Sequence, residues 1–262
     1  MNLSKLIKIS LNQIFINKKY ILNSLIITYG ILVIYGNNTI KVIQNLNLEI
    51  GGVYCVFDVL LPIITEVGVL GPLPLVTIIV PIYILIIFKC SNESNTMYCL
   101  RMKSRKNIWM VKVIVSIIIS IIYCFAIVFG SSLILGIITK GNILNWQSEI
   151  SMMYRLGIIN DNISTIKISI EVILNLMLGL SLIGMIVNLL SNITKQKSVV
   201  FLLILIVCYY DAIMKTSLLL GRVYFKPQYL ISGSTQNIIT LIIVNLILFI
   251  VGYIIEKQKE YA

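Results

Sequence analysis

Six apolar runs, each close to the length that a helix needs to cross a bilayer, dominate this sequence of 262 residues. A transmembrane helix takes roughly 20 predominantly apolar residues. Hydrophobic residues make up 58% of the chain and charged residues 12%, which leaves no room for a separate soluble domain. We therefore predict an all-α integral membrane protein that forms one domain. The six predicted transmembrane helices lie at about residues 20–35, 68–88, 113–135, 168–190, 199–219 and 238–255.

The first 19 residues have the pattern of an amphipathic helix. At 100° per residue, Leu3, Leu6, Ile7, Leu11 and Ile14 fall on one side, whereas Lys5, Lys8 and Asn12 gather on the other. Such a helix lies on a membrane surface. The alternative is an ordinary basic flank that orients the first span. The predicted domain thus comprises an interfacial helix (1–19), six spans (20–255) and a short tail (256–262).

Proline and glycine interrupt the apolar region that contains the second span. The region begins near Val59, and a helix of that length would overshoot the hydrocarbon core. We predict a short outer-surface segment over residues 59–67 and a kink at Pro81, because proline removes a backbone donor and clashes with the preceding turn.

The basic residues predict the orientation of the chain. If all six spans cross, 14 of the 21 Lys and Arg lie on the side of the N-terminus. Basic residues concentrate on the cytoplasmic side of membrane proteins. We therefore predict a multi-pass protein of the cell membrane with both termini in the cytoplasm, and the net charge of +11 then calls for no nucleic-acid partner. The fourteen are Lys5, Lys8, Lys18, Lys19, Lys89, Arg101, Lys103, Arg105, Lys106, Lys112, Lys195, Lys197, Lys257 and Lys259.

The densest basic segment is CLRMKSRKNIWMVK, residues 99–112, which holds five basic residues and no acidic one. One interpretation is that it only fixes the orientation of the chain. The preceding residues 91–95 offer several N-cap side chains, and Glu93 lies where the positive end of a helix would favour it. Met97, Leu100 and Ser104 recur at helical spacing, so a short cytoplasmic helix is also expected. Trp109 would then mark the membrane interface, with the Lys112 side chain reaching toward water.

This architecture and the stretch RMKSRKNIWMVK resemble the permease subunits of type-two ATP-binding-cassette (ABC) exporters. The similarity is narrower to small Gram-positive permeases for lantibiotic or bacitracin-like peptide export and immunity. The resemblance implies a coupling helix that contacts a separate ATPase, a second permease chain, identical or related, and a hydrophobic or cationic antimicrobial peptide as substrate. The coupling residues that it implies here are Glu93, Met97, Leu100, Arg101, Lys103, Arg105 and Lys106.

The sequence contains no GxxxxGK[ST] phosphate-binding loop, so ATP and Mg²⁺ are expected on the partner ATPase and no cofactor on this chain. It also contains no histidine, which excludes catalytic triads and metal sites that depend on one. The five cysteines form no CxxC pair. We predict a transport subunit and no enzyme. The alternative is a six-span scaffold or assembly factor that works without an ATPase.

Four ionisable residues lie inside or beside the spans. Asp211 and Lys215 are four residues apart on one helix face, where they can neutralise each other. An unpaired charge at the centre of a bilayer costs about 2.5–3.5 kcal/mol on insertion scales, so either an internal ion pair or a wet translocation path is expected. Glu66 and Glu171 lie toward the predicted outer side, where they either receive a cationic peptide or are simply hydrated.

Single asparagines in apolar runs predict hydrogen bonds between helices. Asn175, Asn188 and Asn245 are such residues. The small residues of GLSLIG, residues 179–184, predict a place where two helices approach closely.

Overall fold

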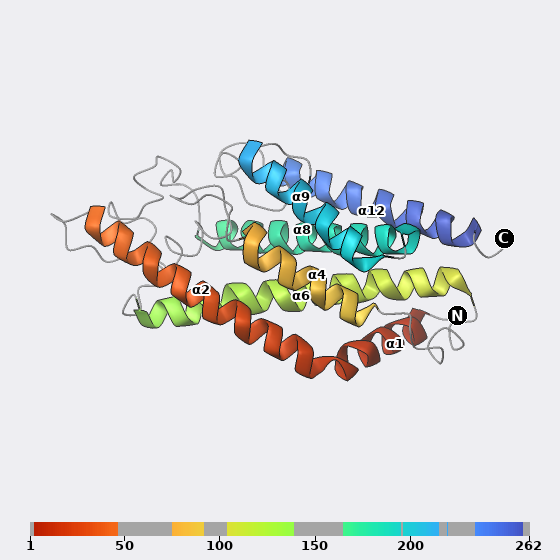
Figure 1. Cartoon of the computed structure of the whole chain (residues 1–262), viewed down its shortest axis with the longest axis horizontal. Coiled ribbons are helices and arrows are strands. Elements are labelled where there is room, and N and C mark those ends of the chain that lie inside the picture. The colour runs from red at the N-terminus through yellow and green to blue at the C-terminus, as the bar shows by residue number, and fades with distance from the viewer. Residues whose placement is uncertain are drawn as a thin grey trace.

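The computed structural model describes residues 3–46, 75–91, 104–138, 165–194, 196–214, 219 and 234–258 (Figure 1). Within these ranges every regular element is helical, which confirms the all-α class. The elements are α1 (Leu3–Ile16), α2 (Lys18–Leu46), the π-helical turn η1 (Leu75–Ile79), α4 (Val80–Cys90), α6 (Arg105–Ile138), α8 (Thr165–Thr194), α9 (Lys197–Met214) and α12 (Ser234–Gln258).

Four described helices are long and apolar enough to cross a membrane. The candidate segments are Arg105–Gly130, Ile170–Thr194, Lys197–Met214 and Thr235–Gln258, and Leu75–Cys90 forms a shorter apolar helix. They fit a membrane protein with several spans. The predicted number of six stays a prediction, because part of the second predicted span lies outside the described residues.

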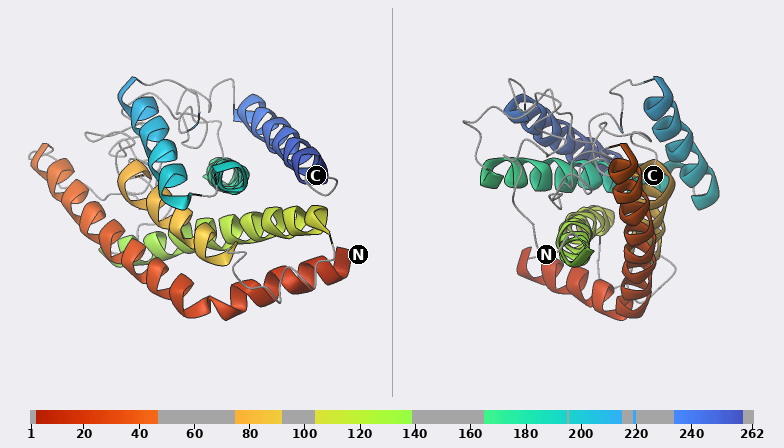
Figure 2. Two further views of the ribbon diagram at one scale, coloured as in Figure 1. Left: turned by 45° about the vertical axis from the view of Figure 1, so that its right-hand side comes forward. Right: turned by 90° about the vertical axis from the view of Figure 1, so that its left-hand side faces the viewer.

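Helices α6 and α8 form the centre of the bundle. Helix α6 contacts α1, α2, α4, α8 and α12, and α8 contacts α4, α6, α9 and α12. Figure 2 (left) shows α8 nearly along its axis, with α6, α9 and α12 around it. Both chain termini lie at the end of the bundle where α6 begins and α8 ends (Figure 1). We call this end the basal end.

Helix α1 is present where the N-terminal pattern predicts a helix, and it packs against α6. Its buried side chains are Leu6, Ser10 and Ile14, which follow one another at a spacing of four residues. The Ser10 hydroxyl donates to the Leu6 carbonyl at 2.9 Å, so its burial leaves no unpaired donor. Ile7 and Leu11, predicted on the same apolar side, are exposed. A position on a membrane surface stays a prediction for this helix.

The helix type changes next to Pro81. Residues Leu75–Ile79 are π-helical, and α4 begins at Val80 with the proline in its first turn. Proline has no N–H to donate, and its ring crowds the carbonyl four residues earlier, so a widened turn accommodates it. The disturbance predicted at Pro81 thus takes the form of a change from π-helix to α-helix. The predicted outer segment 59–67 lies outside the described residues.

A buried cluster of hydroxyl groups joins α2 and α6 to this part of the chain. The Tyr123 hydroxyl lies 3.0 Å from Thr28 Oγ1 and donates to the Ile79 carbonyl at 3.3 Å. The Tyr83 hydroxyl donates to the Ser116 carbonyl at 3.3 Å, and the rings of Tyr83 and Tyr123 are 5.7 Å apart. Because unpaired polar groups are costly away from water, these bonds fix how α2 and α4 lie against α6.

Candidate functional site

The first turns of α6 are the part of the predicted coupling region that the structure describes. We call Ser104–Ser116 the α6 base. Ser104 precedes the helix, and its hydroxyl oxygen accepts the backbone N–H of Asn107 at 3.4 Å, as an N-cap does. Arg105, which is exposed, and Lys106 occupy the first turn. Two cations at the positive end of a helix oppose its dipole, so helix stability does not account for these residue types here.

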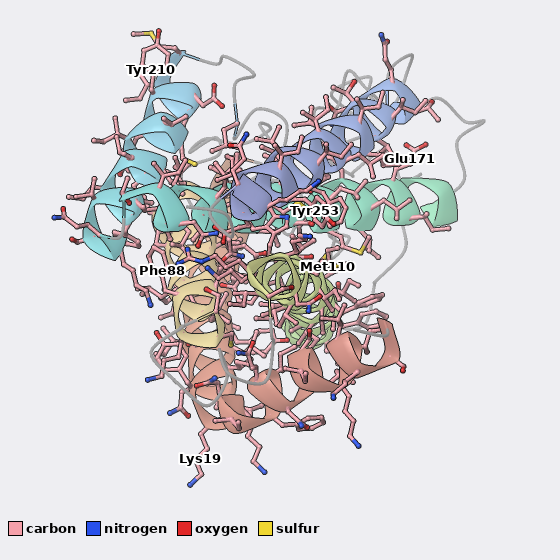
Figure 3. All side chains as sticks on the ribbon, turned by 90° about the vertical axis from the view of Figure 1, so that its right-hand side faces the viewer. Lys19, Phe88, Met110, Glu171, Tyr210 and Tyr253 are labelled. Carbon is pink, nitrogen blue, oxygen red and sulfur yellow. The ribbon has the colours of Figure 1, made fainter. Side chains whose placement is uncertain are left out.

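Trp109 attaches the α6 base to α12. Its side chain is completely buried, and the indole N–H donates to the Phe249 carbonyl at 3.0 Å. The indole occupies space that Gly252 leaves open, because a Cβ atom at position 252 would collide with the ring. Viewed from the basal end, the side chain of Tyr253, which packs in the same cluster, lies between α12 and α6 (Figure 3). A neighbouring helix therefore encloses the Trp109 side chain, and its predicted depth at a membrane interface stays a prediction.

Lys112 attaches the α6 base to α8. The side chain is 5% exposed, and its ammonium group donates to Asn192 Oδ1. One turn further on, Asn188 Nδ2 donates to Ser116 Oγ at 2.8 Å. The expectation that Lys112 reaches toward water is wrong, because α8 supplies a polar partner for it inside the bundle.

All three asparagines that were predicted to join helices do so. Asn188 connects α8 to α6, Asn175 Oδ1 accepts from Asn237 Nδ2 of α12 at 2.5 Å, and Asn245 Nδ2 donates to the Leu178 carbonyl of α8 at 3.2 Å. The predicted close approach in residues 179–184 is also confirmed. A Cβ atom at Gly184 would lie 2.6 Å from the Tyr83 hydroxyl. The polar and small residues of α8 therefore set its distance from three neighbours.

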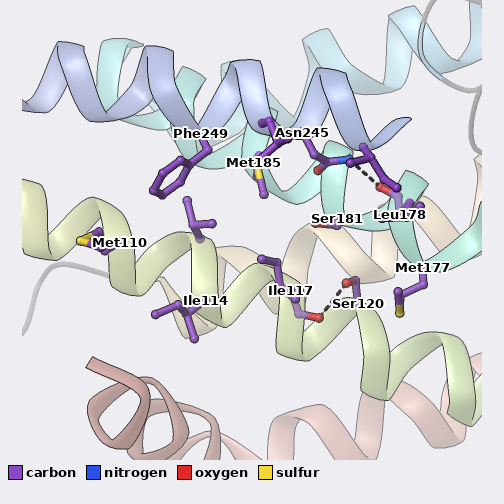
Figure 4. Close-up of a pocket in the computed structure, with 13 residues that line it drawn as sticks. Met110, Ile114, Ile117, Ser120, Met177, Leu178, Ser181, Met185, Asn245 and Phe249 are labelled. Carbon is purple, nitrogen blue, oxygen red and sulfur yellow. Dashed lines mark hydrogen bonds between the residues drawn. The ribbon is translucent and has the colours of Figure 1, made fainter. Parts of the chain in front are cut away.

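A cavity of about 380 Å³ lies between α6, α8 and α12, directly beside the α6 base. We call it the three-helix pocket (Figure 4). Its walls are almost entirely apolar, and its polar lining side chains are Ser120, Ser181 and Asn245. Val113, Met185 and Phe249 line the pocket and belong to the same apolar cluster as the buried Trp109. Its size lies in the range of small-molecule sites.

Most of the predicted coupling residues, Glu93, Met97, Leu100, Arg101 and Lys103, lie outside the described residues, as do Glu66 and Lys215. Arg105 and Lys106 lie together at the basal end. Asp211 is completely buried near the end of α9, and its Oδ2 accepts the backbone N–H of Leu219 at 2.6 Å. Glu171 lies half-buried near the start of α8. Asp211 and Glu171 are thus remote from the α6 base, and the predicted ion pair with Lys215 stays a prediction.

Gly252, Asn192 and the three-helix pocket were not predicted from the sequence. A glycine in the last part of an apolar helix has no distinctive pattern, and only the partner indole gives Gly252 its role. The three methionines of the pocket wall, Met110, Met177 and Met185, lie far apart in the sequence and meet only when α6 and α8 pack.

Comparison with known proteins adds no assignment: no family model matches the chain, and no curated protein or solved structure matches it. Among the described residues, no group of three or more His, Cys, Asp or Glu side chains could hold a metal ion.

Proposed function

We propose that this chain is the permease subunit of an ABC exporter and that the α6 base passes the movement of a separate ATPase into the helix bundle. The observation that carries the proposal is the double attachment of the α6 base. Within two turns of its start, α6 is held to α12 through Trp109 and to α8 through Lys112. A push on the segment before α6 would therefore move three helices together and not one alone.

The charges at the basal end support the same proposal. Arg105 is an exposed cation at the positive end of the α6 dipole, and we propose that it contacts an acidic groove on a partner. Lys89 lies in the last turn of α4, Lys197 begins α9, and both termini lie at the same end (Figure 1). By the positive-inside rule we propose that this end faces the cytoplasm of a cell-membrane protein.

The proposed cycle uses ATP and Mg²⁺ bound by the partner ATPase. Closure of the ATPase pair on ATP would press on residues 93–106, and the α6 base would shift a pair of permease chains between two conformations. The proposed substrate is a hydrophobic or cationic antimicrobial peptide, which rests on the resemblance of residues 101–112 to peptide-antibiotic permeases. A scaffold without an ATPase would not need the double attachment at this end.

The test is purification of the intact chain from its own membranes in mild detergent, with identification of its partners by mass spectrometry. We expect a P-loop ATPase to copurify. Joint replacement of Arg101→Glu and Arg105→Glu should reduce its recovery about tenfold or more, because buried contact charges that lose their partner cost several kcal/mol. Lys18→Glu with Lys19→Glu, two basic positions at the start of α2, is the matched control and should leave recovery unchanged.

Two results would contradict the proposal in different ways. A parent complex without any ATPase would reject the exporter function and favour a scaffold. Normal recovery of the ATPase with the Arg101 and Arg105 variant, at normal membrane insertion, would reject the coupling role of this segment alone.

A further inference from the structure

We propose that α1 binds anionic phospholipid: a row of apolar side chains on this helix enters the acyl-chain region of the membrane, and lysines beside that row contact the phosphate groups. The inference requires that the bundle lies in a membrane, and it does not depend on the transport function proposed above.

The structure divides the predicted apolar side of α1 into two stripes. The first, which includes Leu6 and Ile14, is buried against the bundle. The second follows one residue later at each turn, about 100° further round the helix. It consists of Ile7, Leu11 and Phe15, all exposed, and Phe15 is 66% exposed. We call it the exposed stripe. A row of large apolar side chains on a surface indicates contact with a partner or with lipid.

Lysines border the exposed stripe on the side away from the bundle. Lys8 follows Ile7 directly, and Lys5 lies about one turn earlier. At 100° per residue, both lie nearly opposite the buried stripe, so the exposed stripe runs between the bundle and the lysines. Both are exposed, and neither forms an ion pair with another described residue. No acidic residue precedes Glu49 in the sequence, so these cations are available to an anionic partner.

The order of the stripes favours lipid as that partner. A helix at the boundary of a membrane places its apolar side among the acyl chains, and its lysine side chains extend to the phosphate groups. The next helix, α2, begins with Lys18 and Lys19, and Figure 3 shows Lys19 pointing away from the bundle. Beyond them, α2 exposes Leu22 and Ile26, as a helix in contact with lipid does. Basic and apolar side chains thus follow in the order in which a membrane presents phosphates and acyl chains.

The charge of the lysines indicates which phospholipids they select. Phosphatidylcholine carries a cationic choline beyond its phosphate, and this cation is repelled by lysine. Phosphatidylglycerol presents its phosphate without such a cation. One lysine near an anionic membrane surface contributes about 1 kcal/mol, which corresponds to about a fivefold preference.

An indole on the exposed stripe reports which lipids surround α1. Phe15→Trp is made in the full chain together with Trp146→Phe. Trp109 is retained because its side chain is completely buried, and its signal is subtracted with the chain that lacks the added indole. The chain is reconstituted into vesicles of phosphatidylcholine with a minor share of phosphatidylglycerol. Either lipid in turn carries bromine, a short-range quencher of tryptophan, on the same acyl-chain carbons. Phe129→Trp, at an exposed position far from the basic start of α6, is the control reporter.

We expect phosphatidylglycerol to quench the indole at position 15 about fivefold more strongly per mole than phosphatidylcholine, and the control reporter to show no preference. Lys5→Gln with Lys8→Gln should remove most of the preference at position 15. Lys89→Gln with Lys257→Gln removes the same charge from exposed positions of α4 and α12 and should leave the preference unchanged.

Three results would overturn the proposal. Equal quenching by both lipids at position 15 would reject the selection of anionic lipid. Absence of quenching by either lipid there, while the control reporter is quenched, would mean that a protein covers the exposed stripe. A preference that survives Lys5→Gln with Lys8→Gln would reject the role of these lysines. If Phe15→Trp does not fold, Leu11→Trp places the indole one turn earlier on the same stripe, and the same comparison decides.

Discussion

The contact between α6 and α8 and the contact between α6 and α12 are built on different principles. Along α8, Asn188 pairs with Ser116, Asn192 pairs with Lys112, and Gly184 admits the neighbouring side chains closely. Along α12, the large side chain of Trp109 makes the basal contact, and above it lies the apolar three-helix pocket. The candidate span of α8 is 61% buried and that of α12 only 17%.

This difference indicates which part of the bundle is rigid. Closely spaced hydrogen bonds between α6 and α8 specify one arrangement, because a shift would leave several buried groups unpaired at once. A cavity and an apolar contact specify an arrangement less strictly. We infer that α6 and α8 move as one body and that α12 follows them, because it is bonded to α8 through Asn237 and Asn245 and to α6 at Trp109. Its contact with α6 above Trp109 is the looser one.

Among the variants considered, removal of the Trp109 side chain should weaken the contact between α6 and α12 most. Trp109→Ala should lower the free energy of unfolding by about 3–5 kcal/mol, because it leaves a large cavity at the basal contact between α6 and α12. Unfolding in mixed micelles with rising sodium dodecyl sulfate measures it. Trp109→Phe keeps most of the bulk and should cost clearly less. A cost below about 1 kcal/mol for the alanine variant would show that α12 is held elsewhere.

Gly252 tests the same contact from the other helix. Gly252→Ala should cost about 1–3 kcal/mol in the same assay, because the added methyl group collides with the Trp109 indole. In the Trp109→Ala background that cost should vanish, which a double-mutant cycle would reveal as coupling. Gly30→Ala is the matched control: nothing lies within 4 Å of a Cβ there, so this variant should be neutral or slightly stabilising. Equal costs at both glycines would refute the steric account.

These residues also show how far the sequence predicts the structure. Hydrophobic runs predicted helices, and asparagines in apolar helices predicted contacts between them, because a lone amide in such a helix has few other ways to be paired. Asn175, Asn188 and Asn245 all confirmed this. The exposure to water expected for Lys112 was wrong, and the partner of Trp109 was not predicted, because both depend on which helix faces meet. A tryptophan beside a basic loop has the same local sequence pattern whether its side chain contacts lipid or packs against a glycine on another helix.

The candidate site shows the same limit. The α6 base is marked in the sequence by its charges, whereas its attachments, Gly252 and Asn192, lie more than 70 residues away and carry no signal of their own. The three-helix pocket depends on three helices packing with a gap between them. Periodicity determines neither the partner nor the register of a helix.

A variant at Asn188 tests whether hydrogen bonds stabilise the contact between α6 and α8. Asn188→Leu should cost about 1–2 kcal/mol, toward the upper range for hydrogen bonds between membrane helices, because it removes the partner of Ser116 in a closely packed contact. Ser116→Ala should cost less alone, and the double variant should cost little more than Asn188→Leu. Strictly additive costs would mean that the two side chains do not stabilise each other.

Asn245 is the counterpart of Asn188 on the α12 side, and the same substitution should have the smallest effect. Asn245→Leu removes the bond to Leu178, worth about 0.6 kcal/mol on average between membrane helices, but it also removes an acceptor that has no donor, so the net change should stay within about 0.5 kcal/mol. A cost above about 1.5 kcal/mol in the purified protein would mean that the oxygen is already paired with a bound molecule.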